Sequence, residues 1–190
     1  QVFPLDDRGY TRVLADGLPA SVLGDRKSFT LRTGDMVPED VIRSTLNRSY
    51  VITARFNVKK TGDAEGVLAA AGGYPAGFSL YVKQGRPTFT YNYFGENYTT
   101  VASREKLPRG QAVVRFEFAY DGGGRGEGGM AKLFVNDKLL GEKRLTATVP
   151  NAFTASETFD IGLDTGTPAA LYASPVAFNG HLETVTVDLK

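Results

Sequence analysis

Three glycines, Gly124, Gly126 and Gly129, have the G-x-G-x-x-G spacing that binds phosphate in dinucleotide folds. In those folds the motif follows a strand and opens a helix, whose N-terminus holds the pyrophosphate. Here both flanks, residues 113–120 and 131–135, alternate apolar and polar side chains with the period of a β-strand. We therefore interpret the loop as a glycine-rich hairpin connection, in which glycine serves positive φ and close backbone approach.

The triplet Asp164-Thr165-Gly166 matches the signature of aspartic proteases, whose chemistry needs two carboxylates that share a proton. The chain holds one copy, so protease activity would require a homodimer. A single triplet of this kind is typical of a turn capped by its Asp side chain. Asp164 and Thr165 are therefore predicted to be ligand or interface residues, and no catalytic role is assigned to them.

Glycosidase or lyase chemistry needs two carboxylates about 5 to 10 Å apart across a cleft. The clearest acidic strand position is Glu117, but its neighbours on the same face are Arg115 and Ala119, neither of them acidic. Carboxylates from distant strands could still meet, so a concanavalin-like glycosidase or lyase stays open as an alternative. No catalytic residue is predicted from the sequence.

The residues that could hold a metal ion are few in type. The sequence has no Cys and a single His, His181, so a thiolate zinc site, a cysteine nucleophile and disulfides are excluded. Asp121, Asp160 and Asp164 supply oxygen ligands, and calcium is common in the loops of lectin-like sandwiches. We predict no cofactor, with calcium at these three aspartates as the alternative.

Aromatic residues around the turn at Gly95 could stack on sugar rings. Phe89, Tyr91 and Tyr93 alternate with polar residues, which favours packing in the core. Phe94 and Tyr98 flank the turn and are expected to be the exposed ones. They are the second pair of candidate ligand or interface residues.

The elements that must position these residues are β-strands. Period-two alternation is clearest in residues 50–58, and turn signals recur about every ten residues, which is typical of a sandwich or barrel. The fold predicted is all-β: an antiparallel β-sandwich of jelly-roll, concanavalin A-like type. Residues 1–47 form an irregular N-terminal arm packed on a sandwich domain of residues 48–190, with a helical turn near 38–44. Strands are expected at residues 28–31, 50–58, 67–71, 78–83, 88–94, 98–103, 113–120, 131–135, 138–145, 158–161 and 180–189.

Charge and hydropathy exclude several classes of partner. The chain has 190 residues and a formal net charge of +1, from 22 basic and 21 acidic residues, so no bulk field favours nucleic acid. No apolar run approaches the ~20 residues that a membrane helix needs. The sequence begins at Gln1 without an initiator Met and without a signal peptide, which predicts a processed or excised segment of a longer polypeptide.

Several segments resemble the C-terminal domain of bacterial arylsulfatases. They are residues 77–95 (GFSLYVKQGRPTFTYNYFG), 114–129 (VRFEFAYDGGGRGEGG), 133–142 (LFVNDKLLGE) and 157–168 (ETFDIGLDTGTP). The first is also similar to concanavalin A-like and laminin G-like sandwiches. Upstream, residues 4–8 and 46–54 look like the stretches that lead out of a sulfatase catalytic domain. The resemblance covers nearly the whole chain.

The resemblance implies an accessory role and no reaction of the chain's own. Sulfatases use a formylglycine made in a C/S-x-P-x-R motif, and no such motif occurs here. The expected partner is a sulfatase catalytic domain in the same polypeptide, on which this domain would pack. A carbohydrate-binding, lectin-like module is the alternative. The compartment stays open between the bacterial cytoplasm and the cell envelope for a soluble domain.

Overall fold

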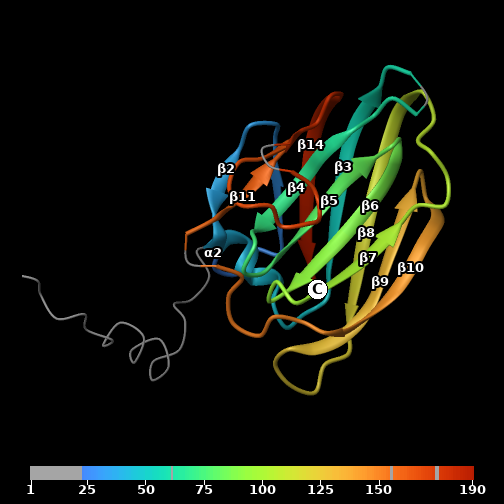
Figure 1. The fold of residues 1–190 in the computed structure, drawn as a ribbon. Coiled ribbons are helices and arrows are strands. Elements are labelled where there is room, and N and C mark those ends of the chain that lie inside the picture. The colour runs from blue at the N-terminus through green and yellow to red at the C-terminus, as the bar shows by residue number, and fades with distance from the viewer. Residues whose placement is uncertain (1–22, 61, 155, 174–175) are drawn as a thin grey trace, which may run out of the picture.

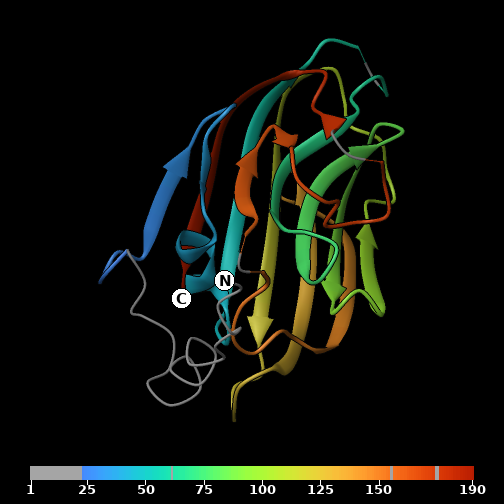
Figure 2. The same ribbon diagram turned by 60° about the vertical axis from the view of Figure 1, so that its left-hand side comes forward.

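The computed structural model describes residues 23–190 except 61, 155, 174 and 175, and in this part of the chain two β-sheets pack face to face (Figures 1 and 2). We call them the front and back sheets, since Figure 1 is viewed from the side of the front sheet. The back sheet has the order β1 (Ser28–Leu31), β14 (His181–Leu189), β3 (Tyr50–Val58), β8 (Gly110–Tyr120), β9 (Glu127–Val135) and β10 (Lys138–Ala147). All its neighbouring strands are antiparallel.

The front sheet is built mainly from the middle of the chain. Its order is β12 (Leu163–Asp164), β13 (Val176–Ala177), β4 (Gly66–Gly72), β5 (Gly77–Lys83), β6 (Arg86–Tyr93) and β7 (Asn97–Ala102). Strand β11 (Thr158–Ile161) also pairs with β4, and β2 (Met36–Pro38) pairs with β11. The pairing of β13 with β4 is parallel and the others are antiparallel. The predicted antiparallel, concanavalin A-like sandwich is thus confirmed.

The core lies between the two sheets, because alternate residues of each strand point to opposite faces. In β8, Val114, Phe116 and Phe118 face inward, as the alternation predicts. Phe116 stacks on Phe89 of β6 with ring centroids 3.6 Å apart, and both side chains are fully buried. This pair joins β8 of the back sheet to β6 of the front sheet.

The described part of the N-terminal arm, residues 23–47, adds two strands and one helical turn to the sandwich. The turn consists of α2 (Glu39–Ile42) and the 3₁₀ helix η1 (Arg43–Thr45), as expected from Pro38 and the acidic residues after it. Glu39 is buried, and its carboxylate accepts hydrogen bonds from the backbone N–H groups of Phe153 and Thr154 (2.6 and 3.1 Å). Predictions for residues 1–22 lie outside the described residues.

The glycine-rich segment joins strand to strand, as predicted. It runs from the end of β8 to the start of β9, and Gly122, Gly123 and Gly126 have positive φ. Asn47 anchors it: the amide side chain accepts from the Gly126 N–H (2.7 Å) and donates to the Pro150 carbonyl (2.7 Å). No helix follows the glycines, so the phosphate-binding geometry of dinucleotide folds is not formed.

All eleven predicted strands are present: residues 28–31, 50–58 and 158–161 match at both ends, and in the others one or both ends shift by one to four residues. The sequence pattern missed β2, β12 and β13, which have two or three residues each. Such short strands show no alternation, and their pairing with distant segments defines them. Within the described ranges, no helix has the length and apolarity needed to cross a membrane.

Candidate functional site

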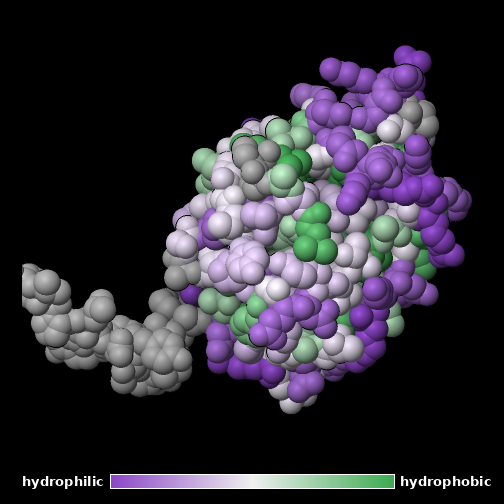
Figure 3. Space-filling model, viewed as in Figure 1, coloured by the Kyte–Doolittle hydropathy of each residue, from purple (hydrophilic) through white to green (hydrophobic). Residues whose placement is uncertain are grey.

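The outer face of the front sheet, which we call the front face, carries hydroxyl and amide side chains. Phe78, Leu80, Phe89 and Tyr91 point into the core, so the residues between them point outward. Paired residues of neighbouring strands share a face. The strand register therefore places on the front face Ser79, Tyr81, Thr88, Thr90, Asn92, Tyr98 and Thr100. Figure 3, seen from this side, shows a surface of near-neutral hydropathy with strongly hydrophilic residues at the upper right.

Hydrogen bonds lock the floor of the front face. The Thr90 hydroxyl lies 3.1 Å from the Tyr81 hydroxyl and 3.0 Å from that of Thr100, across three strands. Thr90 is buried and Thr100 is half-buried, so the network runs from the interior to a residue at the surface. Of these three residues only Thr100 is not buried, and a hydroxyl held in place in this way can bond to a polyhydroxylated ligand without ordering a mobile side chain.

Asn92 ties the turns at one end of the front face together. Its side-chain nitrogen donates to the carbonyls of Gly73 and Tyr74 (2.9 and 3.0 Å), and its oxygen accepts from the Gly95 N–H (2.8 Å). The β4–β5 and β6–β7 turns are thereby held side by side. The Tyr74 side chain is 65% exposed, so its ring is available to a ligand.

The structure places the two predicted aromatic residues, Phe94 and Tyr98, in different surroundings. Phe94 is 47% exposed, has positive φ, and packs edge-on against Tyr93 with centroids 4.7 Å apart. Tyr93 belongs to the layer that borders the core. Tyr98 lies opposite Asn92 on the front face and is half-buried. Tyr98, with Tyr74, is therefore the aromatic residue that adjoins the hydroxyl network.

Asp164 is only 2% exposed and works as an internal anchor. Its Oδ2 accepts from the Tyr172 hydroxyl (2.6 Å) and from the Ala169 N–H (3.4 Å), and the Tyr172 oxygen lies 2.9 Å from the Ser79 hydroxyl. Burial raises the pKa of the Asp164 carboxyl above its ordinary value, although the hydrogen bond from Tyr172 opposes this shift. The arrangement fixes the loop after β12 onto the front sheet.

Thr165 is exposed beside Asp164 and forms hydrogen bonds to Asp160, one of the three aspartates predicted as calcium ligands. Its N–H and hydroxyl both donate to Asp160 Oδ2 (3.0 and 2.7 Å). Two residues further on, the Thr167 hydroxyl donates to Glu157 (2.9 Å) and accepts from the Tyr74 N–H (2.9 Å). The Tyr74 turn thus links the loop that carries Thr165 with the turn next to Tyr98.

The predicted calcium ligands are placed in different surroundings. Asp121 follows β8 of the back sheet and forms an ion pair with Arg144, whereas Asp160 and Asp164 lie at β11 and β12 of the front sheet. In the described part of the chain, no three Asp, Glu or His side chains are grouped so that they could hold a metal ion. Calcium binding stays a prediction based on residue type.

A pocket of about 210 Å³ lies elsewhere, where β3 ends. It is lined by Asn57, Val58, Lys59, Asp63, Ala64, Asn179 and Gly180. None of the residues predicted from the sequence lines it. His181, the single histidine, follows directly at the start of β14 and is exposed.

Sequence reasoning missed Tyr74, Asn92, Thr100 and Tyr172. Asn92 and Thr100 follow from strand alternation once the core face is known, so that signal was present in the pattern. Tyr74 and Tyr172 lie in loops, and their place over the front sheet depends on long-range contacts. No local sequence pattern could therefore predict where Tyr74 and Tyr172 lie.

Replacing Tyr172 with phenylalanine is expected to lower the free energy of unfolding by about 1–2 kcal/mol, because a buried carboxylate loses its hydroxyl donor. The pKa of Asp164 should rise further, since this donor opposes the effect of burial. Urea denaturation and a carboxyl-carbon NMR titration measure the two effects. Tyr74→Phe, at an exposed ring, is the control and should change both by little. An unchanged Asp164 titration in Tyr172→Phe would contradict the anchor.

Comparison with known proteins gives matches among solved structures. No protein-family model and no curated protein matches the sequence significantly. The carbohydrate-binding module CBM40 of the Ruminococcus gnavus IT-sialidase matches with a TM-score of 0.53 and 16% identity, over 86% of this chain and 90% of that one. The same module has been solved with α2,3 sialyllactose (TM-score 0.53) and α2,6 sialyllactose (TM-score 0.52).

A second match is the binding domain of botulinum neurotoxin serotype C1. Its TM-score is 0.51 at 8% identity, over 85% of this chain and 44% of that one. These similarities support the class of fold, a concanavalin A-like β-sandwich, and show nothing beyond the fold. None of them links the chain to an arylsulfatase, so the predicted sulfatase partner rests on the sequence resemblance alone.

Proposed function

We propose that this chain is a carbohydrate-binding domain that holds glycans on its front face. The observation that carries the proposal is the position of Tyr98 and Thr100 on β7, next to a locked network of hydroxyl and amide groups. An aromatic ring beside fixed hydroxyls suits a sugar, which has apolar C–H faces and many hydroxyl groups. The lectin-like fold and the sialyllactose complexes of the R. gnavus module support the proposal.

The contact area would begin at Tyr98 and extend toward Tyr74 and Thr165. Tyr74 and Tyr98 both adjoin Asn92, one through a hydrogen bond and one through the strand register. Thr165 and Thr167 are exposed along the neighbouring loop, and their hydroxyls, which donate to Asp160 and Glu157, can still accept a hydrogen bond from a ligand. Asp164 supports this loop from below and does not touch the ligand, because its carboxylate is buried.

A glycan array that includes sialyllactose and sulfated oligosaccharides tests the proposal directly, followed by calorimetric titration of any ligand found. Tyr98→Ala is expected to weaken binding about tenfold, which corresponds to one lost aromatic contact of ~1.4 kcal/mol. The matched control is Phe134→Ala, which removes an aromatic ring from the back sheet, where it packs under Arg115. Absence of binding to every glycan, or equal loss in both variants, would refute the front-face site.

The proposal assigns no reaction to the chain. Catalysis by a concanavalin-like glycosidase needs two facing carboxylates. The acidic residues beside the loop of Thr165 all accept hydrogen bonds from protein groups: Asp164 from Tyr172, Asp160 from Thr165, and Glu157 from Thr167. The accessory role beside a sulfatase catalytic domain is compatible with glycan binding, and only the sequence resemblance supports it.

A further inference from the structure

One end of the sandwich collects basic side chains, and we call it the basic end. The strand registers bring to this end the last residues of β3, β5, β7 and β9 and the first residues of β4, β6, β8 and β10. It comprises the connections 59–65, 83–86, 103–109 and 136–138, of which residue 61 is not described. In Figure 3 the most hydrophilic residues gather at the upper right, which is where Figure 1 shows these connections.

Hydrogen bonds join these connections into one surface. Gly85 N–H donates to the Ala64 carbonyl (3.1 Å), and Leu107 N–H donates to the Gly85 carbonyl (2.7 Å). Arg104 N–H donates to the Leu140 carbonyl (3.0 Å), which ties the connection 103–109 to β10. The end is therefore a single packed surface, in which the backbones of the connections keep fixed relative positions.

The charges at this end are unbalanced. Eight basic residues stand against four acidic ones, Asp63, Glu65, Glu105 and Asp137. Lys60 pairs with Asp63 (3.8 Å), Lys138 pairs with Glu105, and Asp137 pairs with Arg115 (3.5 Å). Among the described residues, no ion-pair partner is found for Lys59, Lys83, Arg86, Arg104, Lys106 and Arg109. Because the whole chain has a net charge of only +1, this excess is a local feature.

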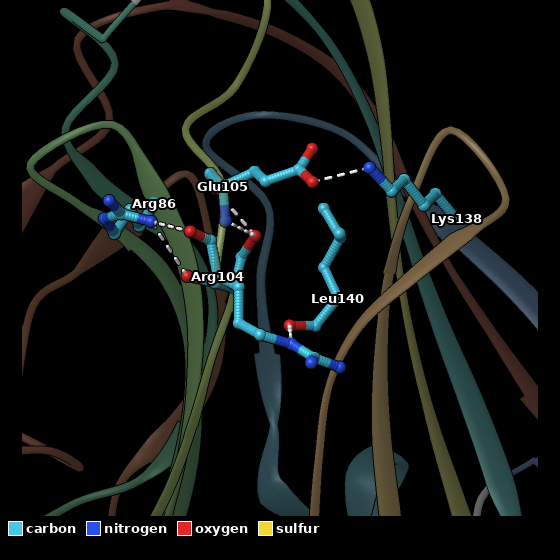
Figure 4. Close-up of polar contacts among 6 residues, drawn as sticks. Arg86, Arg104, Glu105, Lys138 and Leu140 are labelled. Carbon is cyan, nitrogen blue, oxygen red and sulfur yellow. Dashed lines mark hydrogen bonds and ion pairs between the residues drawn. The ribbon is translucent and has the colours of Figure 1, made fainter.

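Two arginines at the basic end are held in place by backbone carbonyls (Figure 4). The guanidinium of Arg86 donates to the carbonyls of Ser103 and Arg104. Arg104 donates through Nε to the Leu140 carbonyl (3.3 Å), and its two terminal nitrogens point away from that contact. Arg104 is exposed. A guanidinium fixed by one edge, with its other N–H groups toward solvent, is preorganised to bind an oxyanion in two hydrogen bonds.

We propose that the basic end binds sulfated glycan chains through Arg104, Lys106, Arg109 and Lys59. The ligand must be anionic, because the surface offers donors and positive charge in excess. A nucleic acid is disfavoured, since the described residues of the four connections include no aromatic side chain on which bases could stack. Sulfate groups on a polysaccharide need only the cationic donors that are present. The site is separate from the front face and does not depend on it.

The test uses heparin as a densely sulfated glycan, and desulfated heparin and single-stranded DNA as comparison probes. The wild-type chain is expected to bind immobilised heparin at about 0.15 M salt and to release it as salt screens the charges. The double variant Arg104→Glu with Lys106→Glu should weaken this binding on the order of tenfold or more. Removal of the sulfates from heparin should abolish binding.

The matched control is Arg26→Glu with Lys27→Glu, which makes the same charge change at the opposite end, beside β1. Both residues are exposed, and circular dichroism checks that each variant is folded. Equal loss of heparin binding in the two double variants would show that only the net charge of the chain matters, and would contradict a site at the basic end. Absence of heparin binding, or equal affinity for DNA, would overturn it as well. Tyr98→Ala should leave heparin binding unchanged. A negative result for the basic end would therefore not count against the glycan site on the front face, nor the reverse.

Discussion

Replacing Phe89 with alanine is expected to lower the free energy of unfolding by about 4 kcal/mol. Phe89 is fully buried and stacks on Phe116 of the opposite sheet at 3.6 Å, so its removal leaves a cavity between the two layers. Phe78, 5.6 Å from Phe89 between ring centroids, loses a partner too. Urea denaturation followed by far-ultraviolet circular dichroism measures the change.

Phe94→Ala is the control for this prediction. Phe94 is 47% exposed, so this substitution should lower the free energy of unfolding by less than about 1 kcal/mol. A double-mutant cycle of Phe89→Leu and Phe116→Leu adds a sharper readout. The coupling between the two rings should be about 1 kcal/mol, the usual size for an aromatic pair. Coupling near zero would show that the pair does not hold the sheets together.

Replacing Glu39 with alanine is expected to lower the free energy of unfolding by about 3 kcal/mol. The buried N–H of Phe153 and the half-buried N–H of Thr154 lose the carboxylate that accepts from them, and leaving a buried donor unsatisfied is costly in free energy. The control is Asp40→Ala: the Asp40 side chain is 44% exposed and forms an ion pair with the less exposed Arg43 (2.8 Å), and the loss of stability should stay within about 1 kcal/mol. Equal losses in both variants would refute the role given to Glu39.

The pH dependence of stability gives a second measure of Glu39. Burial raises the pKa of its carboxyl above the ordinary value near 4.5, because desolvation outweighs the hydrogen bonds to the charged form. The folded state therefore binds the proton more tightly than the unfolded state does. This stabilisation is full below the unfolded pKa and is lost as pH rises through the folded pKa. Relative to Glu39→Gln, the wild-type chain should lose stability as the pH rises above about 4.5 and through the raised pKa of the folded state.

The fold could be predicted because its long strands carry the alternation that defines one buried face. Residues 50–58 and 113–120 show it most clearly, and both became central strands of the back sheet. The helical turn at Glu39 was predicted from Pro38 and two acidic residues. The strands β2, β12 and β13 were out of reach, because their pairing with β11, β4 and each other is decided by packing across the chain.

The candidate site was predicted only in part. Tyr98 and Thr165 lie at the surface near the Tyr74 turn, but Phe94 turns toward Tyr93 because the backbone at residue 94 has positive φ. Asp164 is buried, since Tyr172 returns from the following loop to cover it. Composition also concealed the basic end, because the excess of positive charge there is offset by acidic residues elsewhere in the chain.

The contacts of Asn47 have a practical consequence for making the protein. Residues 47–49 and 97–99 both have the N-x-S/T pattern that secretory hosts glycosylate. The Asn47 nitrogen that would carry the sugar is committed to the Pro150 carbonyl, whereas Asn97 is exposed at the start of β7. A secretory host would thus place an unwanted glycan at Asn97, directly beside Tyr98. Protein for the binding measurements is better produced in the bacterial cytoplasm, where this modification does not occur.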